Sequence, residues 1–397
     1  MKLKSYVYGE WIEGNDNGVP LFNAINGEEI FRISSKGIDF KSVIDYAKSK
    51  GKHISQYTFH ERAVMLKKLA LYLLERKEKY YNISYLSGAT KTDSWIDIEG
   101  GIATMFTYSG KARRELPNER FYLEGNAENL SKKGSFIGHH ICVPLQGVAI
   151  HINAFNFPIW GMLEKFSPTF IAGVPAIIKP ASLTAYLTEV FVKDMIESGI
   201  LPDGSIQLIC GSTGDLLEHV DGQDVVTLTG SASTGRMLKS SKTIVENSVR
   251  FNMEADSLNA SILGPDAVAG TPEFDLYVKE IIKEMTVKAG QKCTSIRRAI
   301  VPEALVEDVI KAVNSRLEKN QLGDPRIDGV RMGPLAGKSQ QQEVGARVAE
   351  LMTVAERVTK EQSDFGITGG DYESGSFFAP TLLYCNNPFG NDIVHSV

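Results

Sequence analysis

The fold is decided by the stretch QGVAIHINAFNFPIWGMLEKFSPTFIAGVPAIIK, residues 146–179. It contains two short apolar runs, Val148–Ile150 and Ala176–Ile178, which have the length of buried strands. Between them, the segment Ile159–Ala172 has the length and apolar content of a helix. A strand, a helix and a second strand in this order are typical of a parallel sheet joined by helices.

The alternation continues along the chain. We expect a helix over 183–198, closed by Gly199, and two further strands at Ile206–Ile209 and Val225–Leu228. Alternating strands and helices predict an α/β fold with a doubly wound, Rossmann-like sheet.

A domain boundary is expected shortly after this region. Val249, Phe251 and Met253 alternate with polar residues, the pattern of a half-buried strand, and the strand ends at Glu254. A new apolar unit begins near 259–263. We therefore expect a first domain over 1–255 and a second α/β domain over 256–397.

The region upstream of 146 is expected to be mostly helical. Apolar spacing predicts one helix from His60 to Lys79 and a second from Ser94 to Leu116. The polar, glycine-containing segment 118–140 follows, and it is interpreted as a hairpin or arm.

Composition excludes several classes of protein. The 397 residues include 43% hydrophobic and 23% charged residues, and the net charge of −5 argues against a nucleic-acid-binding surface. The first residues lack the apolar core of a signal peptide, and the apolar region 141–178 is interrupted by polar residues and prolines, so we expect no membrane segment.

The cysteines indicate neither a disulfide framework nor a metal site. Cys142, Cys210, Cys293 and Cys385 are far apart, and no cysteine or histidine cluster has zinc-ligand spacing. Reduced thiols in a cytoplasmic protein are the simplest interpretation.

Cys293 lies in the sequence Gly-Gln-Lys-Cys-Thr-Ser, residues 290–295. An amphipathic stretch precedes it and is expected to remain helical up to Gly290, and the strand candidate Arg297–Val301 follows. A turn between two ordered elements suits a nucleophile that is presented to substrate. A small buried hydrophobic thiol is an equal alternative from these residues alone.

Two other segments could hold a cofactor. Thr229–Gly235 follows a strand and opens a helix, which suits a phosphate, although it is neither a Walker A loop nor a G-x-G-x-x-G motif. Helix capping explains the same residues. Lys179 ends a buried strand, where it could bind a ribose, and a surface lysine is the alternative.

Two polar residues could act on a substrate. Asn156 lies in a turn after the first strand, where its amide could stabilise an oxyanion; a plain turn residue before Pro158 is the alternative. Glu254 is a candidate general base, because burial among its apolar neighbours would raise its pKa; a solvated carboxylate is the alternative.

In this order along the chain, Asn156, Lys179, Gly230-Ser231, Glu254 and Cys293 resemble the aldehyde dehydrogenase superfamily. Further matching motifs are Tyr8-Gly9-Glu10-Trp11, Asn156-Phe157-Pro158, Ile178-Lys179-Pro180, Met332-Gly333-Pro334-Leu335 and Phe378-Ala379-Pro380-Thr381. The resemblance implies an NAD(P)-binding domain followed by a catalytic domain. It implies an enzyme that oxidises a small-molecule aldehyde.

The resemblance also assigns roles to residues. Cys293 would be the nucleophile, Glu254 the base and Asn156 an oxyanion donor. The expected cofactor-binding residues are Lys179, Ser182, Gly230, Ser231, Phe155, Gly211 and Gly214.

One departure from the family narrows the substrate. The usual Glu-Leu-Gly-Gly-Lys is Glu254-Ala255-Asp256-Ser257-Leu258 here, preceded by Phe251-Asn252-Met253. This variant resembles the aldehyde dehydrogenase domain of the bifunctional phenylacetate-degradation protein, which implies an open-chain, CoA-linked semialdehyde. The semialdehyde dehydrogenase of the aerobic benzoyl-CoA route is the near alternative.

A second departure concerns the cofactor. Many NAD-using members have a glutamate three residues after the ribose lysine, and Ser182 occupies that position here. A carboxylate would repel a 2′-phosphate, whereas a hydroxyl can donate a hydrogen bond to it. We therefore expect NADP, with NAD as the alternative.

A third departure concerns the end of the chain. The family continues with a Glu-x-Phe-Gly-Pro motif, further catalytic elements and an oligomerisation strand, so we expect a C-terminally truncated chain. Residues 118–142 are expected to form an oligomerisation arm, and the complete protein a homo-oligomer.

Three alternative functions remain open. A cysteine hydrolase would pair Cys293 with one of seven histidines, although none lies in a motif that does so. A CoA-acylating dehydrogenase is less favoured because Glu254 supplies a hydrolytic base. A fragment that binds cofactor without catalysis is the third.

Overall fold

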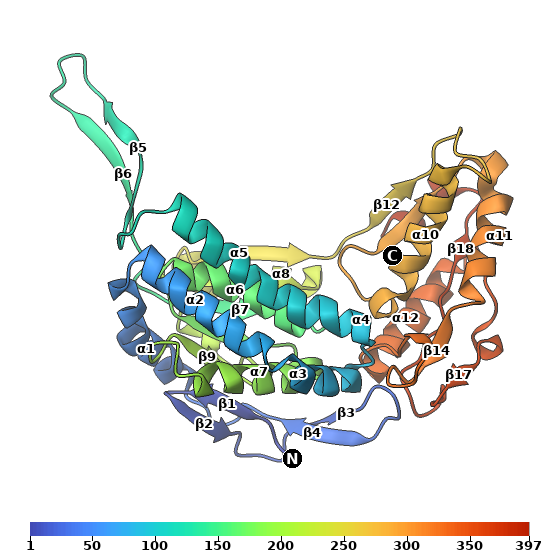
Figure 1. Ribbon diagram of the computed structural model, residues 1–397, viewed down its shortest axis with the longest axis horizontal. Coiled ribbons are helices and arrows are strands. Elements are labelled where there is room, and N and C mark those ends of the chain that lie inside the picture. Colours follow the sequence, from blue (N-terminus) through green and yellow to red (C-terminus); the bar gives the residue numbers. More distant parts are fainter. Residues whose placement is uncertain (397) are drawn as a thin grey trace. The chain divides into compact units, whose positions relative to one another are not determined.

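The computed structural model describes residues 1–396 and divides into two compact units (Figure 1). The first comprises Met1–Pro20, Phe31–Tyr80 and Ile96–Ala255. The second comprises Leu21–Ile30, Tyr81–Trp95 and the chain from Asp256 onward. Two short segments from the N-terminal part of the sequence therefore belong to the second unit.

The first unit is built on a seven-stranded sheet with the order β11-β10-β7-β8-β9-β1-β2. Its strands are β1 (Lys4–Val7), β2 (Glu10–Glu13), β7 (Ala149–Ile152), β8 (Ala176–Lys179), β9 (Ile206–Leu208), β10 (Val225–Gly230) and β11 (Arg250–Ala255). The strands from β11 to β9 are parallel, and β1 and β2 extend the sheet in antiparallel fashion. Of the parallel strands, β7, β8 and β9 are short and almost completely buried, as strands covered by helices on both faces require.

Helices cover both faces of this sheet. On one face lie α2 (Phe59–Leu74), α5 (Gly100–Glu115), α6 (Pro158–Ile171) and α7 (Ala185–Glu197), which pack against one another. On the other face α1 (Phe40–Lys50) and α9 (Lys242–Glu246) contribute to a core with the inward side chains of β7, β8 and β10. The expected doubly wound α/β architecture is confirmed.

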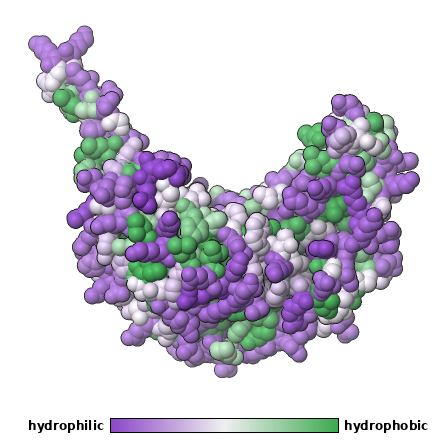
Figure 2. Space-filling view, in the orientation of Figure 1, coloured by the Kyte–Doolittle hydropathy of each residue, from purple (hydrophilic) through white to green (hydrophobic). Residues whose placement is uncertain are grey.

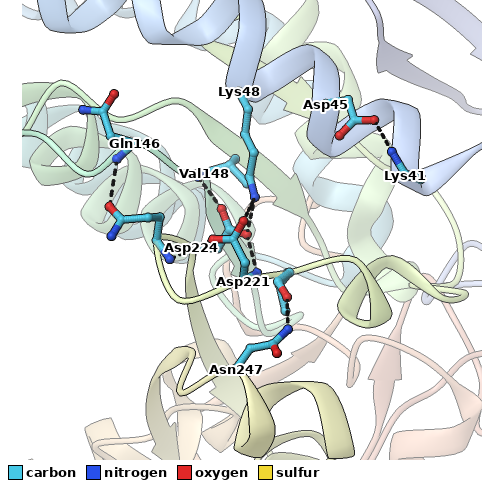
Figure 3. A network of polar contacts seen from close by, with 10 residues as sticks. Lys41, Asp45, Lys48, Gln146, Val148, Asp221, Asp224 and Asn247 are labelled. Carbon is cyan, nitrogen blue, oxygen red and sulfur yellow. Dashed lines mark hydrogen bonds and ion pairs between the residues drawn. The ribbon is translucent and has the colours of Figure 1, made fainter.

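A buried ion-pair network fixes α1 beside the start of β7 and β10 (Figure 3). The Asp224 carboxylate accepts hydrogen bonds from the Val148 N–H at 2.8 Å, the Asp221 N–H at 2.8 Å and the Lys48 ammonium at 2.8 Å. The Lys48 Nζ also lies 2.7 Å from Asp221 Oδ2. The buried Asp224 carboxylate therefore ties α1 to the starts of β7 and β10. The carboxyl ends of these two strands flank the candidate site described in the next section.

The second unit has three small sheets and two apolar cores. Its remaining elements are α4 (Lys91–Ser94), β12 (Asn259–Ile262), α10 (Pro272–Thr286), β13 (Ile296–Ile300), α11 (Val306–Leu317), β14 (Gln321–Gly323), β15 (Val330–Met332), α12 (Lys338–Leu351), β16 (Glu356–Arg357), β17 (Ile367–Thr368), β18 (Leu383–Tyr384) and α13 (Ile393–Ser396). The first core lies between α10 and α11, and the second is centred on Phe377.

Other elements complete the chain. They are β3 (Val19–Phe22), β4 (Glu29–Ile33), α3 (Lys77–Ser84), α8 (Ala232–Lys239) and the hairpin of β5 (Tyr122–Asn129) and β6 (Ile137–Cys142). The hairpin expected over 118–140 is thus present. Within residues 1–396, no helix combines the length and apolar character needed to span a bilayer.

Two expectations about the N-terminal part are wrong. It is not mostly helical at its start, because β1 to β4 occupy much of the first 33 residues and the first helix begins at Phe40. These strands alternate weakly in burial, so their sequences carry little periodic signal. The expected helix His60–Lys79 is two helices, and α2 ends at Leu74.

Candidate active site

The parallel sheet has a topological switch point between β7 and β10. From β7 the chain continues outward through β8 to β9, and then returns to place β10 and β11 on the other side of β7. In open α/β sheets, ligands bind outside the carboxyl ends of the strands at such a point. The loops that follow β7 and β10 are therefore the candidate ligand-binding loops.

The predicted residues of the first unit lie along this carboxyl edge. Phe155 and Asn156 follow β7, Lys179 ends β8 and Ser182 follows it, Gly211 and Gly214 follow β9, Gly230 ends β10 and precedes Ser231, and Glu254 lies at the end of β11. The strand register pairs Ile152 with Lys179 and with Leu228, and Thr229 with Glu254. One edge of one sheet thus carries every one of these side chains; Cys293 belongs to the second unit.

Asn156 is held at the start of α6. Its amide oxygen accepts a hydrogen bond from the Phe157 N–H at 3.0 Å, so its NH2 group is the donor that oxyanion stabilisation requires. The helix itself is capped from elsewhere in the chain. The buried Asp97 Oδ1 accepts the N–H groups of Ile159 at 3.0 Å and Trp160 at 2.8 Å. The N-cap residue of α6 forms no side-chain hydrogen bond, so the Asp97 carboxylate binds the N–H groups that a capping side chain would bind. It thereby fixes the turn that contains Asn156.

The loops after β7 and β8 are joined. Thr184 Oγ1 donates to the Phe155 carbonyl at 3.1 Å, and the exposed Ser182 begins the same short turn. Lys179 is half-buried, and its Nζ donates to the Pro180 carbonyl at 2.7 Å. Burial lowers the pKa of Lys179.

The structural need for glycine differs among the three predicted glycine positions. A Cβ on Gly211 would lie 2.3 Å from the Ser35 nitrogen, and one on Gly214 would lie 2.4 Å from Phe40 Cε2. Packing alone requires glycine there, so these two give no independent support for a cofactor contact. A Cβ on Gly230 would meet only ordinary contacts from 3.7 Å outward. The open backbone at Gly230 is therefore the one suited to close approach of a ligand.

Ser231 has a clear structural role. Its side chain caps α8 by accepting the Thr234 N–H at 3.2 Å. Gly235 lets the same helix pack on β11, since a Cβ there would lie 2.2 Å from Met253 Sδ. The cap leaves the other N-terminal amides of α8 at the carboxyl edge, where they favour an anion.

A buried amide at the switch point has no partner within the protein. The Asn153 side chain directly follows β7 and is 4% exposed. Among the described residues, neither its oxygen nor its nitrogen has a hydrogen-bond partner. Unsatisfied buried polar groups are rare, so this edge is built to receive water or a polar ligand. The donor set around it fits a dinucleotide.

The burial expected for Glu254 is not observed. Its side chain is exposed, and so is Met253 beside it. The reason is topological: β11 is the last strand of the sheet and pairs with β10 alone. Glu254 is therefore a solvated carboxylate at a strand end, which is the alternative that its sequence left open.

Cys293 is presented on a left-handed turn in the second unit. The helix expected to reach Gly290 ends earlier, because α10 stops at Thr286. Lys288, Ala289 and Gly290 then have φ values of 54°, 52° and 71°. Non-glycine residues in this region cost on the order of 1–2 kcal/mol each, so the turn is strained. The Cys293 thiol is exposed and is not part of a disulfide.

The strained turn is anchored upstream by Asp93. This carboxylate, 2% exposed, accepts the Lys288 N–H at 2.7 Å through Oδ1. Its Oδ2 accepts both the N–H and the hydroxyl of Thr90 at 2.8 Å, in a capping box at the start of α4. Because both oxygens are fixed, the anchor for Lys288 is rigid.

The turn is also fixed on its downstream side. Ser295 Oγ donates to the Gly290 carbonyl at 3.0 Å, and Lys292 pairs with Glu284 at 2.7 Å in a nearly buried ion pair. The carbonyl of Cys293 accepts hydrogen bonds from Ser257 Oγ and from Asn259 Nδ2, the latter at 2.6 Å. Contacts from several elements thus hold the backbone of the nucleophile candidate.

Sequence reasoning missed four residues of these supports. Asp93, Asp97, Ser257 and Asn259 were not expected to contribute. The Thr90-Lys91-Thr92-Asp93 spacing is a capping-box signature and could have been noticed. The contact from Asp93 to Lys288 spans 195 residues, and no local pattern indicates it.

A cysteine hydrolase would need a histidine beside the Cys293 thiol. Within the second unit the sequence contains a single histidine, His395. Its Nε2 lies 2.9 Å from the Pro388 carbonyl, where it donates a hydrogen bond. That contact occupies the ring nitrogen in a role unrelated to a thiol.

Comparison with known proteins agrees with this geometry. The chain matches the aldehyde dehydrogenase family over residues 11–388. It is 44% identical to a 3,4-dehydroadipyl-CoA semialdehyde dehydrogenase of Aromatoleum evansii over 399 residues, which covers 100% of this chain and 77% of the relative. It is 26% identical over 389 residues to a D-glyceraldehyde dehydrogenase (NADP+) of Picrophilus torridus, covering 96% of this chain and 74% of that protein.

A solved structure has the same fold. Betaine aldehyde dehydrogenase from Staphylococcus aureus, in complex with NAD+, superposes with a TM-score of 0.81 at 22% identity and covers 98% of this chain and 75% of that chain. The architecture and the extended sequence similarity lead to one conclusion. The chain belongs to the aldehyde dehydrogenase family of oxidoreductases.

Proposed function

We propose that this chain oxidises an open-chain, CoA-linked semialdehyde to the carboxylic acid with NADP as the hydride acceptor. The observation that carries the proposal is the exposed thiol of Cys293 on a strained turn that is anchored at Lys288 and at its own carbonyl. A buried structural cysteine needs no such support. A nucleophile that must meet a carbonyl carbon in one orientation does.

Each of the three catalytic candidates is assigned its own role in the reaction. The Cys293 thiolate forms a C–S bond to the aldehyde carbon, and the carbonyl oxygen becomes an oxyanion. The Cys293 N–H and the Asn156 amide stabilise that charge. The bound cofactor supplies the hydride acceptor. Loss of hydride from the carbon leaves a thioester on Cys293, and Glu254 takes a proton from the water that hydrolyses it. One aldehyde, one NADP and one water give one acid, one NADPH and one proton.

The exposure of Glu254 suits the hydrolytic role. A base that activates water must be reachable by water, and its side chain is exposed at the end of β11. A second role, in deprotonating Cys293, is the alternative. A Glu254→Gln variant that retains one round of NADPH formation but loses turnover would identify hydrolysis as its step.

The carboxyl edge of the sheet would hold the cofactor. Lys179 would bind a ribose, and the open backbone at Gly230 with the amides of α8 would bind phosphate. Ser182 is exposed beside them and can donate to a 2′-phosphate without repelling it. This hydroxyl is the basis for proposing NADP over NAD.

The substrate class rests on similarity along the whole chain. The relative at 44% identity is a dehydrogenase of a CoA-linked semialdehyde. The variant segment 254–258 favours the same class, with phenylacetate degradation as the proposed setting.

The experiment compares aldehydes and products. Purified chain is given NADP and either a CoA-linked semialdehyde or the same aldehyde without CoA, and NADPH absorbance is followed. We expect a higher kcat/KM for the CoA-linked substrate and a free carboxylate as the product. Acyl-CoA formed from added CoA would instead indicate an acylating enzyme, and equal kcat/KM values would refute the substrate class.

A further inference from the structure

We propose that Ser257 and Asn259 are positioning residues that hold the main chain of Cys293 in its reactive orientation. The inference rests on the proposed role of Cys293 as nucleophile. It concerns a contact within the second unit, between the segment that follows Ala255 and the nucleophile turn. We call this pair of side chains the carbonyl clamp.

The clamp is made by two side-chain donors on one acceptor. Ser257 Oγ and Asn259 Nδ2 both donate to the Cys293 carbonyl, the amide at 2.6 Å. A carbonyl oxygen has two lone pairs, so both are used. Asn259 Nδ2 also lies 3.1 Å from the Ser295 carbonyl, which lets its two N–H groups serve one carbonyl each. The Asn259 amide therefore joins the carbonyls of Cys293 and Ser295, the residues on either side of Thr294.

The donors are themselves fixed. Asn259 is the first residue of β12 and is the register partner of Ile296 in β13. Its nitrogen also lies 3.2 Å from Ser257 Oγ, so the two donors are in contact. Asp256, immediately before them, has a φ of 33°, a left-handed conformation that aspartate tolerates better than most residues. The backbone bends there and brings Ser257 to the turn.

The position of this clamp gives it a catalytic consequence. Cys293 carries both the attacking sulfur and a backbone N–H that stabilises the oxyanion, and both move with its peptide planes. Upstream, the turn is strained at Lys288 and Ala289, so it would relax if its downstream end were released. A misplacement of about 1 Å at a reacting centre can cost about 100-fold in rate.

The test uses neutral variants of the two donors. Asn259→Leu removes both N–H groups at similar volume, Ser257→Ala removes the hydroxyl, and Ser257→Thr restores it. The matched control is Asn314→Leu. Asn314 also donates to two carbonyls of the second unit, those of Ile310 at 3.0 Å and Val358 at 2.7 Å, and neither carbonyl belongs to the nucleophile turn.

Two measurements are made on each variant. The first is steady-state kcat and the KM for NADP. The second is amide hydrogen exchange of the peptide covering 290–296, which does not depend on activity. We expect Asn259→Leu to lower kcat by on the order of 100-fold. We expect Ser257→Ala to lower it by about tenfold, with recovery in Ser257→Thr. The KM for NADP should stay within about twofold of the wild type, because both donors contact the nucleophile turn and not the segments proposed to bind the cofactor.

Hydrogen exchange separates the clamp from general stability. Exchange at 290–296 should accelerate by about tenfold in Asn259→Leu, whereas Asn314→Leu should leave this peptide unchanged. Unchanged exchange and unchanged kcat in both clamp variants would overturn the inference. A wild type that oxidises no aldehyde would overturn the proposed function instead. Faster exchange at 290–296 in Asn259→Leu would then still locate the clamp on this turn.

Discussion

At the scale of single residues, two cysteines show opposite environments. Cys210 is fully buried, and burial raises the pKa of its thiol well above the usual value. A thiol of this kind is inert and serves as a small apolar side chain. Cys293 is exposed on a turn that five other residues help to fix. Exposure therefore excludes the buried alternative that the sequence left open for Cys293, and its role as nucleophile stays our proposal.

We propose that the Ser182 side chain determines whether NADP or NAD is preferred. We expect Ser182→Glu to place a carboxylate beside the ribose and to repel a 2′-phosphate. The ratio of kcat/KM for NADP to that for NAD should fall by about tenfold or more, a change of about 1.4 kcal/mol. Steady-state kinetics with both cofactors measures it. Ser49→Glu, on the exposed end of α1, is the control and should leave the ratio unchanged. A wild type that prefers NAD would contradict the NADP proposal.

The buried His151 predicts a pH dependence of stability. His151 is fully buried in β7, with Nε2 3.2 Å from Thr169 Oγ1. Burial, with the nearby charge of Lys165 as a second cause, lowers the pKa of His151 to about 3. The unfolded chain takes up this proton below about pH 6.5 while the native state does not, so stability is lost as pH falls below 6.5. The loss reaches about 2 kcal/mol at pH 5.

His151→Asn should remove this contribution. Urea unfolding at pH 7 and pH 5 should show a smaller difference in the free energy of unfolding than in the wild type. His53→Asn, at an exposed position, should keep the wild-type difference. If the His151 variant loses as much stability as the wild type on acidification, the histidine is protonated in the native state.

At the scale of elements, Asp224 links α1 to the strands of the switch point (Figure 3). Asp224→Asn replaces an acceptor with a donor that faces other donors, and it leaves Lys48 half of its pairing. We expect a loss of about 2–4 kcal/mol in the free energy of unfolding, measured by urea titration. The exposed pair of Lys41 and Asp45 provides the control. Asp45→Asn should change stability by less than about 1 kcal/mol. Equal losses would mean that burial of Asp224 does not matter.

Elements with a strong local sequence pattern could be predicted from the sequence. Element ends that are fixed by contacts with distant residues could not. β7, β8 and β9 are short apolar runs that helices cover on both faces, so their composition alone predicts them. The end of α10 was placed four residues too late. Its apolar spacing continues through Ala289, but the Asp93 carboxylate takes the Lys288 N–H and turns the chain away from the helix.

The same distinction holds for the site. Asn156, Lys179 and Gly230 fall at strand ends, and strand ends of a parallel sheet share an edge, so their grouping could be predicted. The residues that support the site could not be predicted, because Asp97 and Asn259 form hydrogen bonds with residues more than 30 positions away in the sequence. The exposure of Glu254 could not be predicted either, since the alternation of apolar and polar residues does not show that β11 is an edge strand.

At the scale of the whole molecule, the β5–β6 hairpin exposes apolar side chains. Figure 2 shows hydrophobic residues, in green, along this hairpin at the upper left. The exposed set is Phe121, Leu123, Leu130, Phe136, Ile137, Ile141 and Val143. Exposed apolar patches on a paired but otherwise unpartnered hairpin mark an association surface. We propose that a second copy of the chain covers it.

Charge on this surface should prevent association. The double variant Ile137→Lys and Ile141→Lys should behave as a monomer in light scattering, whereas the wild type should have a multiple of the chain mass. Lys132→Ala, in the turn of the same hairpin, should keep the wild-type mass. A monomeric wild type would contradict this proposal and would leave the hairpin uncovered.

The central claim, covalent catalysis by Cys293, is tested most directly by the NADPH burst. Wild type and Cys293→Ala are mixed with NADP and a CoA-linked semialdehyde, and NADPH formation is followed from the first turnover. We predict steady turnover for the wild type and no NADPH above background for Cys293→Ala, although the variant should still bind NADP. NADPH formation by Cys293→Ala at the wild-type rate would contradict the account.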